Sequence, residues 1–281
     1  MFHVKHSIFL RFLVSFYDIL ETVNIHQGEN MKTIAMINQK GGVAKTTSTI
    51  NLGAYLALAG KRTLVIDLDP QGNATSGLGV NRYDLSQCIY DGLIDGEDVT
   101  DLILPTKVPG MDLLPATIQL AGAEIEMVSM LTREYLLKNM IRPLKNYDYL
   151  LIDCPPSLGL LTINALTAAD AYIVPIQCEY YALEGLGQLL KTVELIKKGL
   201  NPNLELCGAL MTMYNPNVNL SAQVVSEVTA FFKEKVFLSI IPRSIRLAEA
   251  PSYGEPISIY APTSKGAIAY EGLAKEVLSR G

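Results

Sequence analysis

The chain contains 281 residues, of which 49% are hydrophobic and 18% are charged, and its formal net charge is −5 at pH 7. This length and composition allow one large α/β domain with a substantial core, and they exclude a disordered or fibrous chain. The acidic balance excludes a protein that is basic over its whole surface, although it allows a local basic patch.

Residues 1–30 differ from the rest of the chain and include an apolar run, residues 7–20, that is interrupted by Arg11. The charge and the absence of a small-x-small cleavage site argue against a signal peptide. An interfacial amphipathic helix is a second interpretation, and translated upstream DNA, with Met31 as the natural start, is a third. We expect residues 1–30 to be an N-terminal extension outside the fold, and residues 31–281 to form one domain.

The most informative motif follows a predicted strand at residues 33–38 and precedes a helical pattern. A strand, a glycine-rich turn and a helix start together form a cradle for an oligophosphate. Gly41 and Gly42 let backbone N–H groups approach the phosphates, and the helix N-terminus adds a positive dipole. Lys45 is placed to reach the β- and γ-phosphates, and the Thr46 hydroxyl is placed to bind Mg²⁺.

This motif does not match the ordinary P-loop pattern. It matches the deviant Walker A form, K-G-G-x-x-K-S/T, in which an additional lysine, Lys40, stands at the front. We therefore predict that the chain binds ATP and Mg²⁺. The predicted nucleotide-binding residues of the loop are Lys40, Gly41, Gly42, Val43, Ala44, Lys45, Thr46 and Thr47.

A second motif ends the next predicted strand, residues 62–67, in two carboxylates, Asp67 and Asp69. Carboxylates at a strand end beside a phosphate site can hold Mg²⁺ through water or can orient the attacking water. A solvated turn capped by aspartate is the alternative interpretation. Asp67 is predicted as a metal-binding residue.

A third motif is the apolar strand predicted at residues 149–153, which ends at Asp153 and is followed by Pro155 and Pro156. This is the Walker B arrangement, and it predicts that Asp153 lies near the Mg²⁺ held by Thr46. The two prolines stop the strand and stiffen a loop where a γ-phosphate could be sensed.

The remaining apolar runs complete an alternation of strands and helices, which predicts a doubly wound, mostly parallel sheet flanked by helices. Further strands are expected at residues 111–114, 171–175, 206–213 and 236–241. Helices are expected at residues 46–59, 121–144, 160–168, 183–199, 220–235 and 267–279.

With these motifs in place, residues 31–281 resemble the ParA/Soj family of chromosome- and plasmid-partitioning ATPases, and most of all its chromosomal Soj branch. The matching segments are residues 38–42 (NQKGG), 67–75 (DLDPQGNAT), 115–117 (PAT), 153–159 (DCPPSLG), 177–185 (QCEYYALEG) and 241–243 (IPR).

The resemblance implies an ATP-dependent homodimer in which Lys40 reaches across the interface to the partner's phosphates. It implies that Asp69 positions the attacking water, so that Lys40, Asp69 and Lys45 are the catalytic residues. Met213 and Pro242 lie where the family holds the adenine.

The resemblance also implies that the ATP dimer binds DNA without sequence preference and is released when a ParB/Spo0J-like centromere-binding protein stimulates hydrolysis. Arg246 matches one DNA-contacting arginine of the family, and Lys265 is a second basic candidate. For Arg246 alone, a solvated surface arginine is the alternative interpretation. The implied location is the cytoplasm, on the nucleoid, without stable membrane association.

The chain departs from the family at three positions. Ala44 stands where the family usually has glycine, which would strain the loop if that residue needs a positive φ. Asn217 and Thr263 stand where relatives carry basic residues, so DNA binding is expected to be weaker or to rely on other lysines.

Rival classes fit less well. A MinD-like membrane-cycling ATPase should end in a basic amphipathic helix, but residues 273–281 are short and mixed in charge. An amidoligase-type enzyme needs a further substrate domain. A nitrogenase-reductase-like carrier needs cysteines that share a cluster across a dimer, and Cys154, directly after Asp153, does not fit that use. A non-catalytic DNA-binding module would not need the lysines and aspartates named above.

Overall fold

The computed structural model describes residues 31–180, 182–183 and 185–280. The N-terminal extension predicted at residues 1–30 lies outside the described residues. The described chain forms a seven-stranded sheet in the order β3-β4-β2-β5-β1-β6-β7. All neighbouring strands are parallel except β3 and β4. The strands are β1 (Lys32–Met36), β2 (Thr63–Asp67), β3 (Leu104–Pro105), β4 (Met111–Leu114), β5 (Tyr149–Asp153), β6 (Ala171–Gln177) and β7 (Glu205–Thr212).

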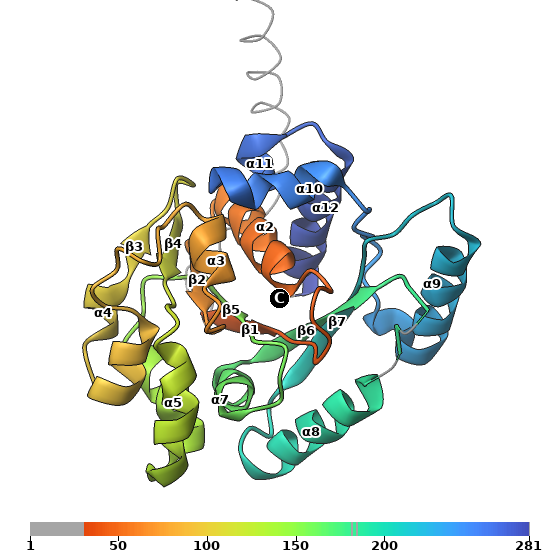
Figure 1. Ribbon diagram of the computed structural model, residues 1–281. Coiled ribbons are helices and arrows are strands. Elements are labelled where there is room, and N and C mark those ends of the chain that lie inside the picture. The colour runs from red at the N-terminus through yellow and green to blue at the C-terminus, as the bar shows by residue number, and fades with distance from the viewer. Residues whose placement is uncertain (1–30, 181, 184, 281) are drawn as a thin grey trace, which may run out of the picture. The chain divides into compact units, whose positions relative to one another are not determined.

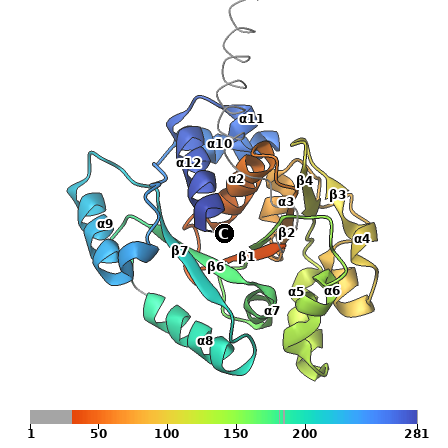
Figure 2. The same ribbon diagram turned by 180° about the vertical axis from the view of Figure 1, so that it is seen from behind.

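Helices cover both faces of the sheet, which confirms the predicted doubly wound fold (Figures 1 and 2). One face carries α2 (Lys45–Leu58), α3 (Asn73–Gly77), α10 (Ile245–Glu249), α11 (Ile257–Tyr260) and α12 (Lys265–Arg280). The other face carries α5 (Leu120–Glu126), α6 (Leu136–Ile141), α7 (Leu160–Ala168), α8 (Leu186–Gly199) and α9 (Asn219–Phe232). Two short helical segments, the π-helix η1 (Asp91–Asp95) and α4 (Val99–Leu102), precede β3.

The central strands are buried on both sides, which is why their sequences are continuous apolar runs. In β2, Leu64 and Ile66 pack into the core on the α7 side, whereas Val65 packs toward α2. In β5, Leu151 likewise packs toward α2. The register pairs Asp67 with Asp153, so the two predicted acidic strand ends lie side by side.

The strand predicted at residues 236–241 is not formed. Among the described residues this segment forms isolated bridges, Ala209 to Val236 and, just beyond it, Tyr214 to Pro242. The N–H groups of Phe237 and Ile241 also donate to the β7 carbonyls of Ala209 and Met211, at 3.0 and 2.9 Å, but no continuous ladder forms. Between them the N–H groups of Leu238 and Ser239 donate to the carboxylate of Glu276 at 2.8 and 2.7 Å. A side chain of α12 therefore takes the donors that a strand ladder would need. The edge strand β3, which is antiparallel, was not predicted.

The single helix predicted at residues 121–144 is also wrong. The segment contains α5, two 3₁₀ turns, η2 (Met127–Ser129) and η3 (Arg133–Tyr135), and α6. Thr132 has a φ of 52°, which breaks the helix. Asn164 stabilises the break, since its Oδ1 accepts from the Leu137 N–H at 3.1 Å and its Nδ2 donates to the Arg133 carbonyl at 2.8 Å. Apolar periodicity alone could not reveal this interruption.

The four cysteines, Cys88, Cys154, Cys178 and Cys207, are all buried and free. No helix in the described part of the chain is both long and apolar enough to cross a membrane.

Candidate nucleotide-binding site

The predicted phosphate loop connects the carboxyl end of β1 to the start of α2, in the middle of the sheet (Figure 1). Its backbone is held from several sides. The Asn38 amide donates to the Pro175 carbonyl at 2.7 Å, and the Asn38 Oδ1 accepts from the Lys40 N–H at 2.9 Å. The Thr212 hydroxyl donates to the Val43 carbonyl at 3.1 Å. These contacts hold the loop open at the edge where doubly wound folds bind ligands.

The glycines of the loop have the freedom that a phosphate cradle requires. Gly42 has a φ of 73°, and a Cβ there would meet nothing within 4 Å. A Cβ on Gly41 would lie 4.0 Å from the Cβ of Pro156, which places the loop beside the segment that follows Asp153. The space over both glycines is compatible with close approach of a phosphate to the backbone.

Ala44 adopts the left-handed conformation, with φ 66° and ψ 34°. It immediately precedes α2, so the residue that departs from the family pattern is the one that needs a positive φ. An alanine in this region is strained by contact between its Cβ and the backbone.

We expect Ala44→Gly to raise the free energy of unfolding by about 1 kcal/mol, because glycine adopts this conformation without the Cβ clash. Urea denaturation measures the change. Ala230→Gly, at an exposed position inside α9, is the matched control and should destabilise the protein by about 0.5–1 kcal/mol. A loss of stability in both variants would contradict the interpretation of Ala44 as strained.

Lys45 begins α2 and points back under the loop. Its side chain is buried, and its ammonium group donates to the Lys40 carbonyl at 3.2 Å. Burial lowers the pKa of Lys45, while the nearby Asp153, Cys154 and Asp69 act in the opposite direction. A buried cation with a single hydrogen bond in the described part of the chain is well placed to receive anionic oxygens.

Thr46 and Asp153 are in direct contact. The Thr46 hydroxyl donates to Oδ2 of Asp153 at 2.6 Å, and Thr49, one turn later in α2, donates to Oδ1 at 3.3 Å. A hydroxyl and a carboxylate at the end of a phosphate loop are hard oxygen donors, which Mg²⁺ prefers. The donor set therefore fits the predicted metal site.

Asp67 and Asp153 are both fully buried. Burial raises the pKa of Asp67 to about 6, although hydrogen bonds from the Thr75 hydroxyl and N–H oppose the shift. Burial, followed by repulsion from Asp67, raises the pKa of Asp153 to about 8. Adjacent buried carboxylates disfavour double ionisation, so this edge of the sheet attracts cations.

The Asp67 oxygens already accept bonds from the protein. Oδ2 accepts from Thr75, and Oδ1 accepts from the Asp69 N–H at 3.2 Å. These bonds shape the turn that carries Asp69, whose Oδ1 accepts from the Gln71 N–H at 2.9 Å. A metal-binding role for Asp67 and a catalytic role for Asp69 remain predictions.

Lys40 is half-buried at the front of the loop. Its backbone takes part in the contacts with Asn38 and Lys45 described above. Its ammonium group forms no ion pair with any carboxylate in the described part of the chain. The backbone and side chain of Lys40 therefore have separable roles.

Met213 and Pro242, the predicted adenine contacts, lie next to each other. Tyr214 forms an isolated parallel bridge with Pro242, and its N–H donates to the Ile241 carbonyl at 3.0 Å. Met213 has a φ of 53° and so ends β7 with a sharp turn. The two residues are far apart in sequence, and the structure brings them together at the carboxyl end of β7.

Arg246 and Lys265, the predicted DNA contacts, lie on neighbouring elements. Leu247 packs against Gly266, because a Cβ on Gly266 would lie 2.8 Å from Cγ of Leu247. Both basic side chains are exposed. Arg246 forms an ion pair with Glu249 at 3.1 Å. Among residues 31–180, 182–183 and 185–280, no ion pair joins either side chain to the phosphate loop.

Sequence reasoning assigned no role to several residues that shape the site. Asn38 and Thr75 lie inside the quoted family motifs, so a signal for them existed. Thr49 and Thr212 had no signal, because their contacts with Asp153 and the loop depend on the packing of α2 and β7.

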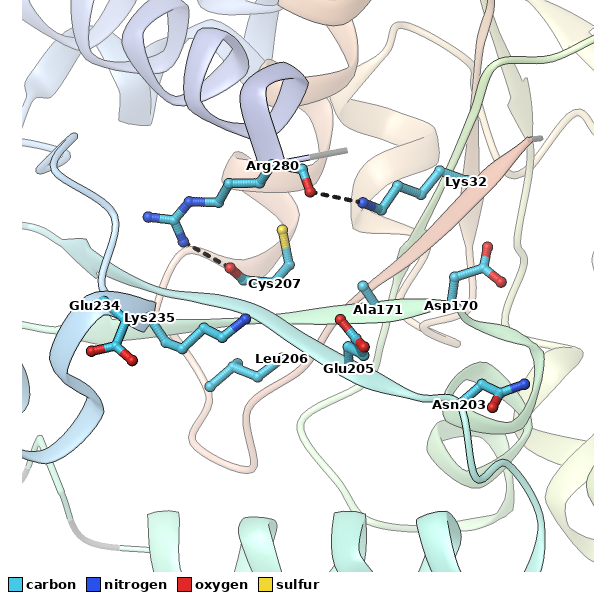
Figure 3. Close-up of a pocket in the computed structure, with 10 residues that line it drawn as sticks. All are labelled: Lys32, Asp170, Ala171, Asn203, Glu205, Leu206, Cys207, Glu234, Lys235 and Arg280. Carbon is cyan, nitrogen blue, oxygen red and sulfur yellow. Dashed lines mark hydrogen bonds between the residues drawn. The ribbon is translucent and has the colours of Figure 1, made fainter. Parts of the chain in front are cut away.

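A hollow of about 480 Å³ lies away from this site, at the opposite edge of the sheet (Figure 3). It adjoins the first residues of β1, β6 and β7, and it contains none of the predicted site residues. Its charged side chains balance one another: Lys32, Lys235, Arg280, Asp170, Glu205 and Glu234. Arg280 closes one side by donating to the Cys207 carbonyl at 2.8 Å. The hollow therefore shows no preference for a ligand of either charge.

The chain is similar in sequence and fold to known proteins. The family described as an AAA domain matches residues 31–206. The chain is similar to the sporulation initiation inhibitor protein Soj of Bacillus subtilis (strain 168), with 58% identity over 251 residues, 89% of this chain and 99% of that protein. It is 50% identical over 250 residues to the chromosome partitioning protein ParA of Myxococcus xanthus (strain DK1622), which covers 89% of this chain and 88% of that protein.

Among solved structures, the chain is similar to cobyrinic acid a,c-diamide synthase from Mycobacterium smegmatis with bound ADP and magnesium. The TM-score is 0.79 and the identity 40%, over 89% of this chain and 94% of that chain. The similarities to these three proteins each cover 89% of this chain and at least 88% of the other protein.

Proposed function

Because the chain belongs to the ParA/Soj family of chromosome-partitioning ATPases, we propose that its Mg²⁺-dependent hydrolysis of ATP switches it between DNA-bound and free states. The observation that carries the proposal is the convergence of Lys45, Thr46 and Asp153 at the phosphate loop. Nucleotide hydrolysis needs a lysine for the phosphates, a hydroxyl and a carboxylate for Mg²⁺, and a loop whose backbone a phosphate can approach. The site contains all three.

In the proposed site Lys45 and the loop N–H groups hold the phosphates, while Thr46 and Asp153 hold Mg²⁺. When bound, Mg²⁺ supplies positive charge to the phosphate oxygens. The similar structure with bound ADP and magnesium supports this pair of cofactors. Asp69, on the turn shaped by Asp67, orients the attacking water.

We place Lys40 at the interface of an ATP-dependent homodimer. Its ammonium group forms no ion pair within the described part of its own chain. A lysine supplied by the second protomer would neutralise charge that develops during phosphoryl transfer. Hydrolysis would then require the dimer. Dimer formation, in turn, would place the basic residues of two protomers on one surface.

Arg246 and Lys265 support DNA binding through phosphate contacts, which carry no sequence preference. The family name supports a role on the chromosome, so the proposed location is the nucleoid in the cytoplasm. A ParB-like centromere-binding protein is the proposed activator of hydrolysis.

The alternative is a MinD-like membrane-cycling ATPase. One observation weighs against it: the apolar face of the C-terminal helix α12 is already buried, with Tyr270, Leu273 and Val277 packed into the core shared with α2. A helix that lies on lipid needs that face free.

ATP turnover and DNA binding test the proposal together. The chain is expected to hydrolyse ATP slowly and to be stimulated by DNA, and Asp69→Ala should abolish turnover while leaving ATP-dependent DNA binding in place. DNA binding should weaken steeply with salt. Stimulation by lipid vesicles but not by DNA would replace this proposal with the membrane-cycling alternative. Turnover that survives in Asp69→Ala would refute the role given to Asp69.

A further inference from the structure

The turn that carries Asp69 is contacted at two points by residues 115–117, a segment that has no role in the proposed function. This segment follows β4 and is one of those that match the family. Gly72 ends the turn with a φ of 59°, and a Cβ there would lie 2.9 Å from the Ala116 carbonyl oxygen. The Ala116 N–H donates to the Thr75 hydroxyl at 2.9 Å. Ala116 therefore packs against the end of the turn and is bonded to the helix that follows it.

The Thr75 hydroxyl can be oriented in only one way. Thr75 is fully buried. A backbone N–H can only donate, so the Thr75 oxygen accepts from Ala116 and its hydrogen is left for another group. That group is Asp67, whose Oδ2 accepts from the Thr75 hydroxyl at 2.7 Å and from the Thr75 N–H at 2.8 Å. Thr75, on α3 beside β2 in Figure 1, thus joins the end of β2 to the segment after β4.

These bonds give the two oxygens of Asp67 different surroundings. Oδ2 accepts two bonds from Thr75, which occupies both of its lone pairs. Oδ1 accepts one bond, from the Asp69 N–H at 3.2 Å. The carboxylate of Asp67 is therefore fixed in rotation, with Oδ2 toward α3 and Oδ1 toward the backbone of Asp69. Without the Thr75 hydroxyl, Oδ2 would lose one of the two bonds that set this orientation.

The Asp69 side chain is held within its own turn. Its Oδ1 accepts from the Gln71 N–H at 2.9 Å, and its carbonyl accepts from the Gly72 N–H at 2.8 Å. The position of the Asp69 carboxylate consequently follows the position of the turn. The turn is fixed by Asp67 at its start and by the contact between Gly72 and Ala116 at its end.

We infer that Thr75 is a positioning residue for ATP hydrolysis: its hydroxyl, bonded to Ala116, orients Asp67 and so places the turn from which Asp69 acts on water. This inference rests on the proposed function, since it adds a residue to the machinery proposed for Asp69. Nucleotide binding is assigned to the phosphate loop, Lys45 and Thr46. Loss of the Thr75 hydroxyl should therefore slow the hydrolytic step and leave ATP affinity nearly unchanged.

Thr75→Val removes the hydroxyl and keeps the backbone N–H. At saturating ATP and Mg²⁺ its single-turnover rate is expected to fall about tenfold or more, whereas affinity for a fluorescent ATP analogue should stay within about twofold of the wild type. Thr75→Ser keeps the hydroxyl and should retain most of the rate. Thr63→Val is the matched control, because Thr63 is also fully buried and begins the same strand at its opposite end, where its hydroxyl donates to the Lys61 carbonyl at 3.1 Å. This control should change neither quantity.

A wild-type rate in Thr75→Val would overturn the inference. So would an equal loss of rate in Thr75→Ser or in Thr63→Val, or a parallel loss of analogue affinity, since Thr75 would then support the binding site as a whole. Should Thr75→Val fail to fold, Gly72→Ala is the second variant, because its Cβ would press on the Ala116 carbonyl. The same split between rate and affinity is expected, and a wild-type rate in Gly72→Ala would count against the inference.

Hydrogen exchange of the full chain without nucleotide separates this inference from the proposed function. Thr75→Val should speed exchange of the Gly72 and Ala116 amides about tenfold, whereas Thr63→Val should not. A wild-type chain without ATP turnover would refute the proposed function, and faster exchange in Thr75→Val would still support the role of Thr75 in holding the turn. Unchanged exchange at both amides would refute that role whatever the turnover.

Discussion

Replacing Lys40 with alanine is expected to lower ATP turnover about 10³-fold while ATP affinity changes little, as for a charge supplied in trans to a phosphoryl group. This substitution should remove the ammonium group of Lys40 and leave the loop conformation unchanged. The bonds of Lys40 to Asn38 and Lys45 use its backbone, which alanine keeps. Single-turnover hydrolysis and binding of a fluorescent ATP analogue measure the two effects separately, and Lys197→Ala on α8 is the exposed-lysine control.

A mixing experiment identifies the protomer on which Lys40 acts. Lys40→Ala and Asp69→Ala are each expected to be inactive alone. If Lys40 acts across the interface, a mixed dimer contains one complete site, so an equal mixture should recover about a quarter of the wild-type turnover. If Lys40 acts within its own protomer, no site in the mixture is complete and activity stays at the level of the single variants. That second outcome would refute the trans role.

The second large effect is a dependence of stability on pH in the protein without nucleotide and Mg²⁺. The pKa of Asp67 is raised to about 6 and that of Asp153 to about 8, both mainly by burial, from an ordinary value of 3.8. Between about pH 4 and about pH 8, the folded protein therefore binds more protons than the unfolded chain. The free energy of unfolding should therefore fall as pH rises from about 4 to about 8, and level off above that range.

The expected loss across this range is on the order of several kcal/mol, since one pKa unit corresponds to about 1.4 kcal/mol and the two carboxyls titrate as a pair. Urea denaturation at several pH values measures it. Asp153→Asn keeps the shape of the side chain and an acceptor for Thr46, so it should flatten the curve and stabilise the protein near pH 8. Glu97→Gln, an exposed neutralisation, is the control. A stability that rises with pH through this window would contradict the assignment.

The chemistry of the site could be predicted to a large degree, because its parts are short and local in the sequence. A glycine-rich segment between a strand and a helix predicts a phosphate loop when a lysine and a threonine follow it at the spacing of Lys45 and Thr46. The acidic residues that end β2 and β5 were expected to converge because parallel strands end at a common edge. The structure pairs Asp67 with Asp153 in register and joins Thr46 to Asp153.

The errors arose where a distant side chain competes with a local preference. Residues 236–241 have the composition of a strand, but Glu276 of α12 takes two of their N–H donors. Residues 121–144 have helical periodicity, but Asn164 of α7 holds the chain open at the break. Neither contact leaves a signal near the segment that it changes.

The sequence by itself determined the fold class, the motifs that end the central strands, and the family. These depend on apolar periodicity and on residues adjacent in the chain. Only the tertiary structure decided that Ala44 is left-handed, that Tyr214 pairs with Pro242, and that Ile125 on α5 is exposed. Each of these depends on which elements pack together. Backbone conformation at one residue and the burial of one helix face are set by contacts between segments that the sequence keeps far apart.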